Sequence, residues 1–316
     1  MTNNSIAILL PVYNGGNYLK ESVQSVLAQA YTQFELIIVD DCSSDGSREW
    51  LRTLKDERIK YFENPVNQGL FKNLNQMVSK TNATLIKLWA QDDIMYPNCI
   101  AETVAFHNRN PSIGFSYTGR DIIDENGTIK SNDKIDSTPE IISTELHARI
   151  AYYTGSIAGN IANTCISKAA LDKVGPFNES MKISADFDMW VRLAEFYDTG
   201  FINKKLIQLR DHSGQLSRNE KYYINHVRED LQVYKYLDGY VSNSIRVEGK
   251  KIMRVQKLNF YYTLMLKSFI SGNFKTGFTY LKLLSGYDNI SALSINFFKS
   301  KMTNTKKPAF LLNYEN

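Results

Sequence analysis

Two short apolar runs, each followed by a pair of aspartates, constrain the fold of this chain most. They occupy residues 36–41 (LIIVDD) and 85–93 (LIKLWAQDD). Such runs are typical of buried parallel strands. Ligands of an open α/β sheet collect at the carboxyl ends of its strands, so the two acid pairs could hold a divalent cation and its phosphates. Capping of a turn or helix explains a single pair equally well, but a second pair weakens that explanation.

The order of the predicted elements is that of an α/β protein. They are, in turn, a strand at 5–12 broken by Pro11, a helix at 19–27, a strand at 36–39, a helix from Ser47, a strand at 58–62, a helix at 70–79 and a strand at 85–89. This alternation predicts a mixed, mainly parallel sheet with helices on its faces and right-handed crossovers. The motifs GxGxxG and GxxxxGKS are both absent, which argues against a dinucleotide-binding or P-loop enzyme.

Beyond residue 110 the pattern is weaker. We expect a strand at 114–118, a helix at 141–153 and a strand at 200–209. From about residue 220 the pattern is helical, and apolar residues three or four apart at 252–269 and 274–284 form two stripes.

Composition sets the class of protein. The 316 residues, 43% hydrophobic and 22% charged, allow one large domain or one domain with an appendage. Three cysteines without a CxxC spacing predict neither a disulfide framework nor a thiolate metal site, and a reducing cytoplasm fits best. The apolar run at 6–12 is short and lacks a basic leader, which argues against a signal peptide. No run of about 18 apolar residues occurs, so we expect no membrane span.

Charge separates the last third of the chain from the rest. Residues 220–316 carry 15 Lys and Arg against 7 Asp and Glu, a net charge of +8, whereas residues 1–219 carry −4. We expect the first two helical stripes to pack within the protein. The candidate exposed aromatics Phe297 and Phe298, beside Lys299 and Lys301, also allow peripheral contact with an anionic membrane. Nucleic-acid binding is not expected, because the basic residues are dispersed through apolar helices.

Several motifs, in order, carry a family resemblance. They are PVYN at 11–14, VQSVLAQ at 23–29, FELIIVDDCSSDGS at 34–47, NQG at 67–69, Asn73-x-Asn75, the acids at 92–93, KVGPF at 173–177 and ADFDMWVR at 185–192. Over roughly 220 residues this order resembles the family 2 nucleotide-sugar glycosyltransferases of the GT-A fold. The resemblance implies a Rossmann-like catalytic domain at 1–219, with a nucleotide-binding half (1–110) and an acceptor half (111–219). A basic helical segment would follow at 220–316.

The resemblance also implies roles for residues of the nucleotide-binding half. Asp41 would accept the imide N–H of uracil or thymine, with Pro11 and Tyr13 beside the base. Asp92 would hold the ribose or assist the metal, and Asp93 would ligate Mn²⁺ or Mg²⁺ on the diphosphate. Ala90 stands where the family's commonest motif has its first acid. This Gln-Asp-Asp form leaves open which acid touches the ion.

Other implied roles are weaker. Lys72 would contact phosphate, although a solvated helix face explains it better. His212 lies in a segment resembling the loop that closes over the donor, together with Gln215, and could touch the diphosphate or metal. Gly159 and Asn160 would help to shape the acceptor site.

Asp186 is the implied general base of an inverting transferase, taking the proton from the acceptor hydroxyl. Taken alone, Asp186 and Asp188 are better explained as acids of a first helical turn, where they interact favourably with the helix dipole, and the family resemblance reverses this preference. A non-catalytic protein that only binds a nucleotide sugar or glycan is the alternative. Ala90 slightly favours this alternative, whereas Asp186 favours an enzyme.

The resemblance implies transfer of a sugar from a nucleoside diphosphate, most often UDP, to a glycan or lipid-linked acceptor. Such proteins often build bacterial cell-surface polysaccharides, which would place this one in the cytoplasm or peripherally at the inner face of the membrane. A sugar-phosphate nucleotidyltransferase is a less favoured alternative, because it would want a Gly-rich basic loop where residues 11–14 read PVYN. The sequence leaves the oligomeric state open, a homo-oligomer included.

Overall fold

The computed structural model describes residues 4–130, 137–212 and 222–302. The chain divides into two compact units: residues 1–144, 158–182 and 192–215 form the first, and residues 145–157, 183–191 and 216–316 form the second. The helical unit thus contains two segments from within the range 1–219 as well as the C-terminal segment.

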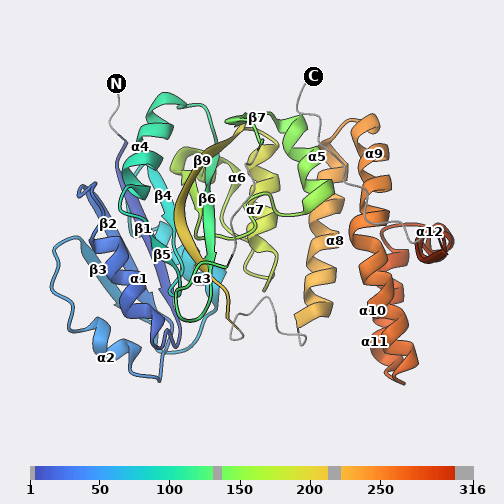
Figure 1. Cartoon of the computed structure of the whole chain (residues 1–316), viewed down its shortest axis with the longest axis horizontal. Helices are drawn as coiled ribbons and strands as arrows, with labels where there is room; N and C mark the ends of the chain where they lie inside the picture. The colour runs from blue at the N-terminus through green and yellow to red at the C-terminus, as the bar shows by residue number, and fades with distance from the viewer. Residues whose placement is uncertain (1–3, 131–136, 213–221, 303–316) are drawn as a thin grey trace. The chain divides into compact units, whose positions relative to one another are not determined.

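The described part of the first unit contains a mixed nine-stranded sheet (Figure 1). Its strands are β1 (Ile6–Val12), β2 (Phe34–Asp40), β3 (Ile59–Glu63), β4 (Leu85–Leu88), β5 (Ile94–Met95), β6 (Phe115–Ile123), β7 (Ile141–Ile142), β8 (Thr164–Ser167) and β9 (Thr199–Arg210). The order is β3-β2-β1-β4-β8-β6-β9-β5, with β7 on β9. Strands β1 to β4 are parallel, and β8 runs antiparallel to β4 and β6. The predicted mixed sheet is confirmed.

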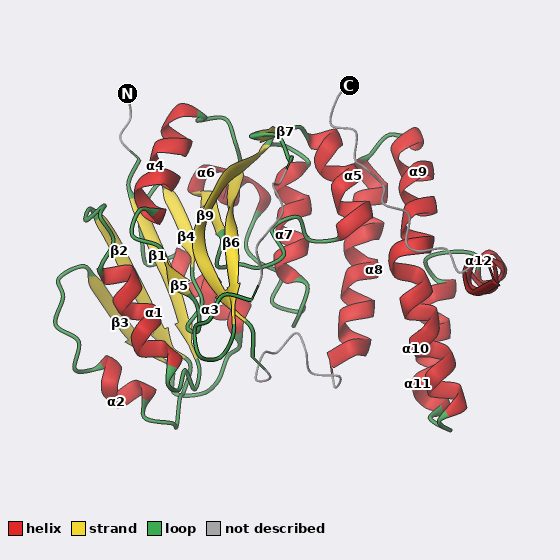
Figure 2. Ribbon diagram, viewed as in Figure 1, coloured by secondary structure: helices red, strands yellow, loops and turns green. Residues whose placement is uncertain are grey.

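Helices cover both faces of this sheet. They are α1 (Tyr18–Leu27), α2 (Ser47–Leu51), α3 (Leu70–Val78), α4 (Cys99–Arg109) and α6 (Lys168–Val174). The apolar sides of α1 and α4 pack on the face formed by Ile6, Ile8 and Leu10 (Figure 2). Each fully buried side chain of this kind contributes roughly 1.5–3 kcal/mol by leaving water.

Pro11 does not break the first strand as expected. It lies inside β1, opposite Val39 of β2. The carbonyl of Leu9 accepts from the peptide N–H of Trp89, and the ladder between β1 and β4 ends at Leu9 and Leu88. Two residues further on, the nitrogen of Pro11 faces the same side, beyond that ladder, so its missing N–H removes no sheet hydrogen bond.

The second unit is helical. Its elements are α5 (Thr144–Thr154), α7 (Ala185–Ala194), α8 (Tyr223–Tyr240), α9 (Asn243–Met253), the π-helical η3 (Arg254–Leu258), α10 (Asn259–Ile270), α11 (Phe274–Ser285) and α12 (Ile290–Met302). Tyr234 of α8 stacks on Tyr152 of α5 and packs edge-on against Phe187 of α7. Gly249 lets α9 approach closely, because a Cβ there would lie 2.3 Å from the ring of Tyr152. Among the described residues, every helix is too short or too polar to cross a bilayer.

Some local expectations were incomplete or wrong. The strands β5 and β8 and the helices α4 and α6 were not expected. The helix expected at 141–153 begins only at Thr144, because Ile141–Ile142 pairs with β9 as β7. Phe297 is 8% exposed and packs on Tyr262, so it is not a surface aromatic, whereas Phe298 is exposed.

Candidate functional site in the first unit and the α7 carboxylate in the second

The loops that follow β1, β2 and β4 are tied to one another at the carboxyl edge of the sheet. The peptide N–H of Tyr13 donates to Gln91 Oε1 at 2.9 Å, and Gln91 Nε2 donates to the carbonyl of Tyr13 at 3.1 Å. The N–H of Asn14 donates to Ser43 Oγ, and the N–H of Ser44 donates to Asn14 Oδ1, both at 2.9 Å. The structure therefore joins the segments that carry Tyr13, Asp41 and the Asp92-Asp93 pair.

These contacts explain the unusual residues before the second acid pair. Gln91 forms the two hydrogen bonds to the backbone of Tyr13. Ala90 packs against the core, and its carbonyl accepts from Ser22 Oγ at 2.8 Å. The first acid position of the commoner motif is thus a packing position here, which leaves Asp92 and Asp93 as the acids of this loop.

Asp41 is held as a hydrogen-bonded carboxylate. It is 3% exposed. Its Oδ1 accepts from Asn64 Nδ2 and from the N–H of Gln68, and its Oδ2 accepts from the N–H of Gly69, each at 2.8 Å. Burial raises the pKa of Asp41, but the hydrogen bonds outweigh it, so the net pKa lies below its usual value. Oδ2 takes one bond and retains acceptor capacity for another donor.

Asp93 is almost fully buried, at 1% exposed. Its Oδ1 accepts from the N–H of Arg210 at 2.8 Å, whereas its Oδ2 is buried and has no hydrogen-bond partner among the residues that the structure describes. Burial, then the charge of Asp92, raises the pKa of Asp93 to about 8. Asp92 Oδ2 lies 3.0 Å from His212 Nε2. The end of β9 thus folds back onto the acids at the end of β4.

Arg210 is a site residue whose role the sequence did not reveal. Its guanidinium is nearly buried, and Nε donates to the carbonyl of Asp92 at 2.9 Å while Nη2 contacts Glu21 Oε2 at 2.6 Å. The same guanidinium lies 4.5 Å over the ring of Tyr18. One cation therefore fixes the backbone of the acid pair.

Asp92 and Asp93 suit a cation whose coordination is completed by the substrate. Within residues 4–130, 137–212 and 222–302, no three His, Cys, Asp or Glu side chains form a ready-made cage. Mg²⁺ and Mn²⁺ favour oxygen ligands, and Mg²⁺ is usually held by one or two carboxylates with waters and substrate phosphates. The unpartnered Oδ2 of Asp93 and the adjacent pair of Asp92 and His212 fit that chemistry.

The remaining residues predicted for this unit differ in their surroundings. Pro11 is half-buried, Tyr13 is 49% exposed and Lys72 is exposed on α3. Their ligand contacts stay predictions.

The segment expected to shape the acceptor site is tied to β6. Gly159 is exposed with a φ of +66°, and Asn160 Oδ1 accepts from the N–H of Ala162 at 2.6 Å. Arg120 of β6 donates to the carbonyl of Ala158 at 2.6 Å. Gln215 lies outside the described residues.

In the second unit, Asp186 lies in the first turn of α7 and is half-buried. Burial raises the pKa of Asp186 to about 6, and the charge of Asp230 adds to the rise, while the N–H of Phe187 and the charge of Lys257 oppose it. A carboxylate with such a pKa is charged near neutral pH and can still accept a proton, as a general base requires.

Two adjacent acids of α8 hold the start of α7. Glu229 Oε2 accepts from the N–H of Ile183 at 2.8 Å and of Ser184 at 2.9 Å. Asp230 Oδ1 accepts from Ser184 Oγ at 2.8 Å. Both acids are buried. Glu229 thus occupies two peptide N–H groups, and Asp230 the hydroxyl of Ser184, immediately before the helix that carries Asp186.

An ion pair between buried Asp230 and partly buried Lys257 completes this group. Asp230 Oδ2 contacts Lys257 Nζ at 2.8 Å and accepts from the hydroxyl of Tyr261 at 2.7 Å. Sequence reasoning missed Glu229, Asp230 and Lys257. Two adjacent acids within a strongly basic segment were the available signal.

Comparisons with known proteins identify the family and the fold of this chain. The model of the family "Glycosyl transferase family 2" matches residues 7–173. An uncharacterized glycosyltransferase of Rickettsia conorii is 32% identical over 215 residues, which cover 67% of this chain and 35% of that protein. The chain thus spans well under half the length of that relative.

Solved structures share the fold. S. aureus TarS 1–349 in complex with UDP-GlcNAc matches with a TM-score of 0.64 and 18% identity, covering 82% of this chain and 73% of that one. The mannosyltransferase PcManGT from Pyrobaculum calidifontis, in complex with GDP-Man and Mn²⁺, matches with a TM-score of 0.58 and 12% identity, covering 96% and 81%. Both confirm the predicted GT-A architecture. Since the family model matches more than half of the residues, the chain belongs to glycosyl transferase family 2.

Proposed function

We propose that the protein transfers a sugar from a nucleoside diphosphate, with UDP as the preferred nucleotide, to a hydroxyl of a glycan or lipid-linked acceptor of a bacterial cell-surface polysaccharide. The observation that carries this proposal is Asp41, a buried carboxylate kept charged at the end of β2. A charged acceptor with a free lone pair suits the imide N–H of uracil. TarS, which shares the fold, binds UDP-GlcNAc.

Mn²⁺ or Mg²⁺ is the proposed cofactor. Asp93 would hold it through the unpartnered Oδ2, and Asp92 and His212 would lie beside it. When bound, the ion would neutralise charge that builds up on the departing diphosphate. PcManGT is a fold relative that binds Mn²⁺. A cation next to Asp93 would also favour its charged form.

Asp186 is the proposed general base of an inverting reaction. It would accept the acceptor's hydroxyl proton as that oxygen attacks the anomeric carbon opposite the leaving diphosphate. The proposal is supported by a pKa raised to about 6, because the group then combines a charged form at neutral pH with useful basicity.

A thermal-shift screen of UDP, GDP, dTDP, ADP and CDP with and without Mn²⁺ tests the donor site. A ligand that binds only the folded state raises the melting temperature. We expect UDP with Mn²⁺ to give the largest rise, and Asp93→Asn to remove the part that depends on Mn²⁺. Equal shifts from all five nucleotides, or none, would overturn the donor assignment.

Slow hydrolysis of UDP-sugars separates an enzyme from a protein that only binds them. We expect hydrolysis in the presence of Mn²⁺ and its loss in Asp186→Asn, with UDP binding retained. Binding without any turnover, for a panel of UDP-sugars and hydroxyl acceptors, would instead support the non-catalytic function.

A further inference from the structure

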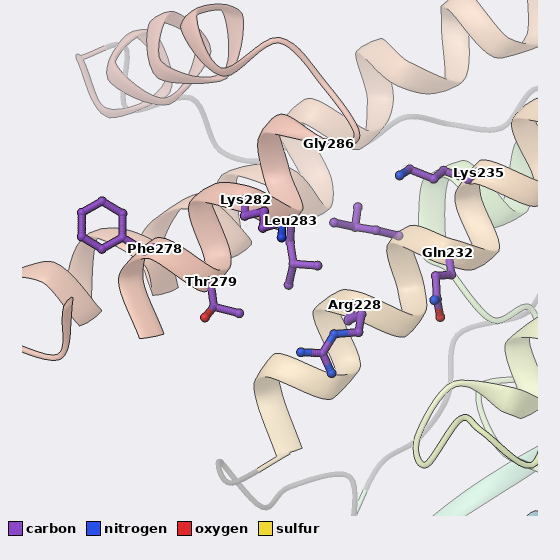
Figure 3. Close-up of a pocket in the computed structure, with 9 residues that line it drawn as sticks. Arg228, Gln232, Lys235, Phe278, Thr279, Lys282, Leu283 and Gly286 are labelled. Atoms are coloured by element: carbon purple, nitrogen blue, oxygen red, sulfur yellow. The ribbon is translucent and has the colours of Figure 1, made fainter. Parts of the chain in front are cut away.

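The second unit contains a basic groove between α8 and α11, with a volume of about 710 Å³. Arg228, Gln232 and Lys235 come from α8. The other wall is formed by Phe278, Thr279, Lys282 and Leu283 of α11 and by Gly286, which follows it (Figure 3). Figure 3 shows Arg228 and Leu283 pointing into the space between the two helices. The wall residues recur three or four positions apart, so each helix presents one continuous face.

All charged side chains that line this groove are positive. Arg228, Lys235 and Lys282 line it together with apolar and neutral residues, and no acid is among the lining residues. All three cations are exposed, and within the described residues none of them forms an ion pair. Three unpaired cations beside apolar side chains complement an anionic group attached to an apolar body.

An exposed apolar cluster adjoins the groove along α11. Phe274 and Phe278 are each 60% exposed, and Ile270, at the end of α10, is 86% exposed. Phe269 joins them, because its ring centroid lies 6.3 Å from that of Phe274 and 5.2 Å from that of Phe278. Phe278 also lines the groove. Large apolar side chains gathered at a surface mark an interaction site.

The two helices that carry this cluster also carry exposed lysines and contain no acids. Lys267 of α10 and Lys275 of α11 are exposed. Residues 259–285, which form α10 and α11 with their turn, contain Lys but no Asp or Glu. Such a combination of exposed aromatics and lysines is typical of surfaces that lie in the headgroup region of an anionic bilayer.

We propose that α10 and α11 dock on an anionic lipid bilayer, with Ile270, Phe274 and Phe278 in the headgroup boundary and a lipid phosphate in the groove between Arg228 and Lys282. A free phosphate ion would engage the cations but leave the apolar cluster in water. A lipid engages both. The proposed membrane-binding surface is therefore formed by the end of α10 and by α11, and it does not include Phe298 of α12.

Sedimentation of the full chain with vesicles tests the proposal. We compare phosphatidylcholine vesicles with vesicles in which roughly a third of the lipid is phosphatidylglycerol. Binding is expected only to the anionic vesicles, and it weakens as salt is added. Arg228→Gln with Lys282→Gln lowers the affinity about 25-fold, since each cation near such a surface contributes about fivefold. Equal binding to both vesicles would overturn the proposal.

Matched variants guard against unspecific effects. Lys55→Gln with Lys251→Gln removes the same charge from exposed positions outside the groove and is expected to bind as the parent does. Phe274→Ser with Phe278→Ser lowers the affinity about tenfold or more by removing apolar contact area. Phe298→Ser leaves it unchanged. The opposite result for these aromatic variants would place the contact on α12 and overturn the proposal.

A second arm separates a lipid from a soluble ligand. If inorganic phosphate raises the melting temperature of the parent but not of Arg228→Gln with Lys282→Gln, and vesicle binding is the same for both, the groove is a site for soluble phosphate and the lipid assignment fails. Melting temperatures without ligand check that each variant folds. No sugar donor enters these measurements, so their outcome is independent of the proposed transferase activity.

Discussion

The two acids to which the proposed reaction assigns opposite tasks, Asp41 and Asp186, are held in opposite ways. Asp41 accepts hydrogen bonds from Asn64 and two peptide groups, and its pKa lies below its usual value. Burial and the charge of Asp230 raise the pKa of Asp186 to about 6. One carboxylate is therefore stabilised in its charged form, and the other has a pKa close to neutral pH, at which it can take a proton.

The two sites show how the surroundings of a carboxylate set its pKa. In the first unit, donors on the loop before α3 surround the carboxylate, as a recognition group for a base requires. In the second unit, the neighbouring carboxylate of Asp230 and partial burial favour the neutral form of Asp186, which raises its pKa as a proton acceptor requires. Variants that convert either environment into the other test this contrast.

The largest expected effect comes from Asp186→Asn. An amide cannot accept the proton, so kcat should fall about 10²- to 10⁴-fold while the Kd for UDP stays the same. Sugar transfer and calorimetric UDP binding measure the two quantities. Asp188→Asn, which alters the other acid of the first turn of α7, is the control and should retain activity. A loss of UDP binding in Asp186→Asn that matches the loss of activity would remove Asp186 from the role of base.

Asp41→Asn should act on binding instead. The neutral amide loses a charged hydrogen bond and turns its N–H₂ group toward the N–H donor of either Gln68 or Gly69, so UDP binding should weaken by about 1.5–3 kcal/mol, or roughly 10- to 100-fold in Kd. Glu35→Gln, at the amino end of the same strand, is the control. An unchanged Kd for UDP in Asp41→Asn would show that this carboxylate serves the loop alone.

Sequence patterns were sufficient where a contact is local or where the strand order determines it. The apolar runs before Asp41 and Asp93 predicted two parallel strands that end at one edge, and β2 and β4 flank β1 there. The role of Gln91 was not predictable, because its tie to Tyr13 joins residues 78 positions apart. Pairing of β8 with β4 was also missed, because β8 is a strand of only four residues.

The surroundings of Asp186 show this limit most clearly. The sequence indicated the acid and its helix, but the groups that tune and hold it lie on α8 and η3, 43 or more residues later. In the sequence, Glu229, Asp230 and Lys257 look like ordinary charges of a solvated helix. Only the tertiary fold buries Glu229 and Asp230 and partly buries Lys257, and burial is what gives such charges influence on a neighbouring carboxylate.

Glu229→Gln should reduce kcat about tenfold without changing the Kd for UDP. The neutral amide is a weaker acceptor for the N–H groups of Ile183 and Ser184, so the start of α7 is held less firmly, and small displacements of a catalytic group are costly. Glu248→Gln, which alters an exposed acid paired with Arg149, is the control. If kcat stays unchanged while the melting temperature falls, Glu229 stabilises the fold without positioning Asp186.

The smallest expected effect is a shift in pH dependence. In the parent, kcat/KM should fall about tenfold per unit below pH 6, because protonated Asp186 cannot act as a base. Asp230→Asn removes a negative charge that raises this pKa and leaves Lys257, whose charge lowers it, so the acidic limb should move to lower pH. Asp238→Asn, a neighbouring acid of α8, should leave the limb in place. A limb that stays fixed or moves upward in Asp230→Asn would show that Asp230 does not tune the base, and burial would then be the remaining cause of the raised pKa of Asp186.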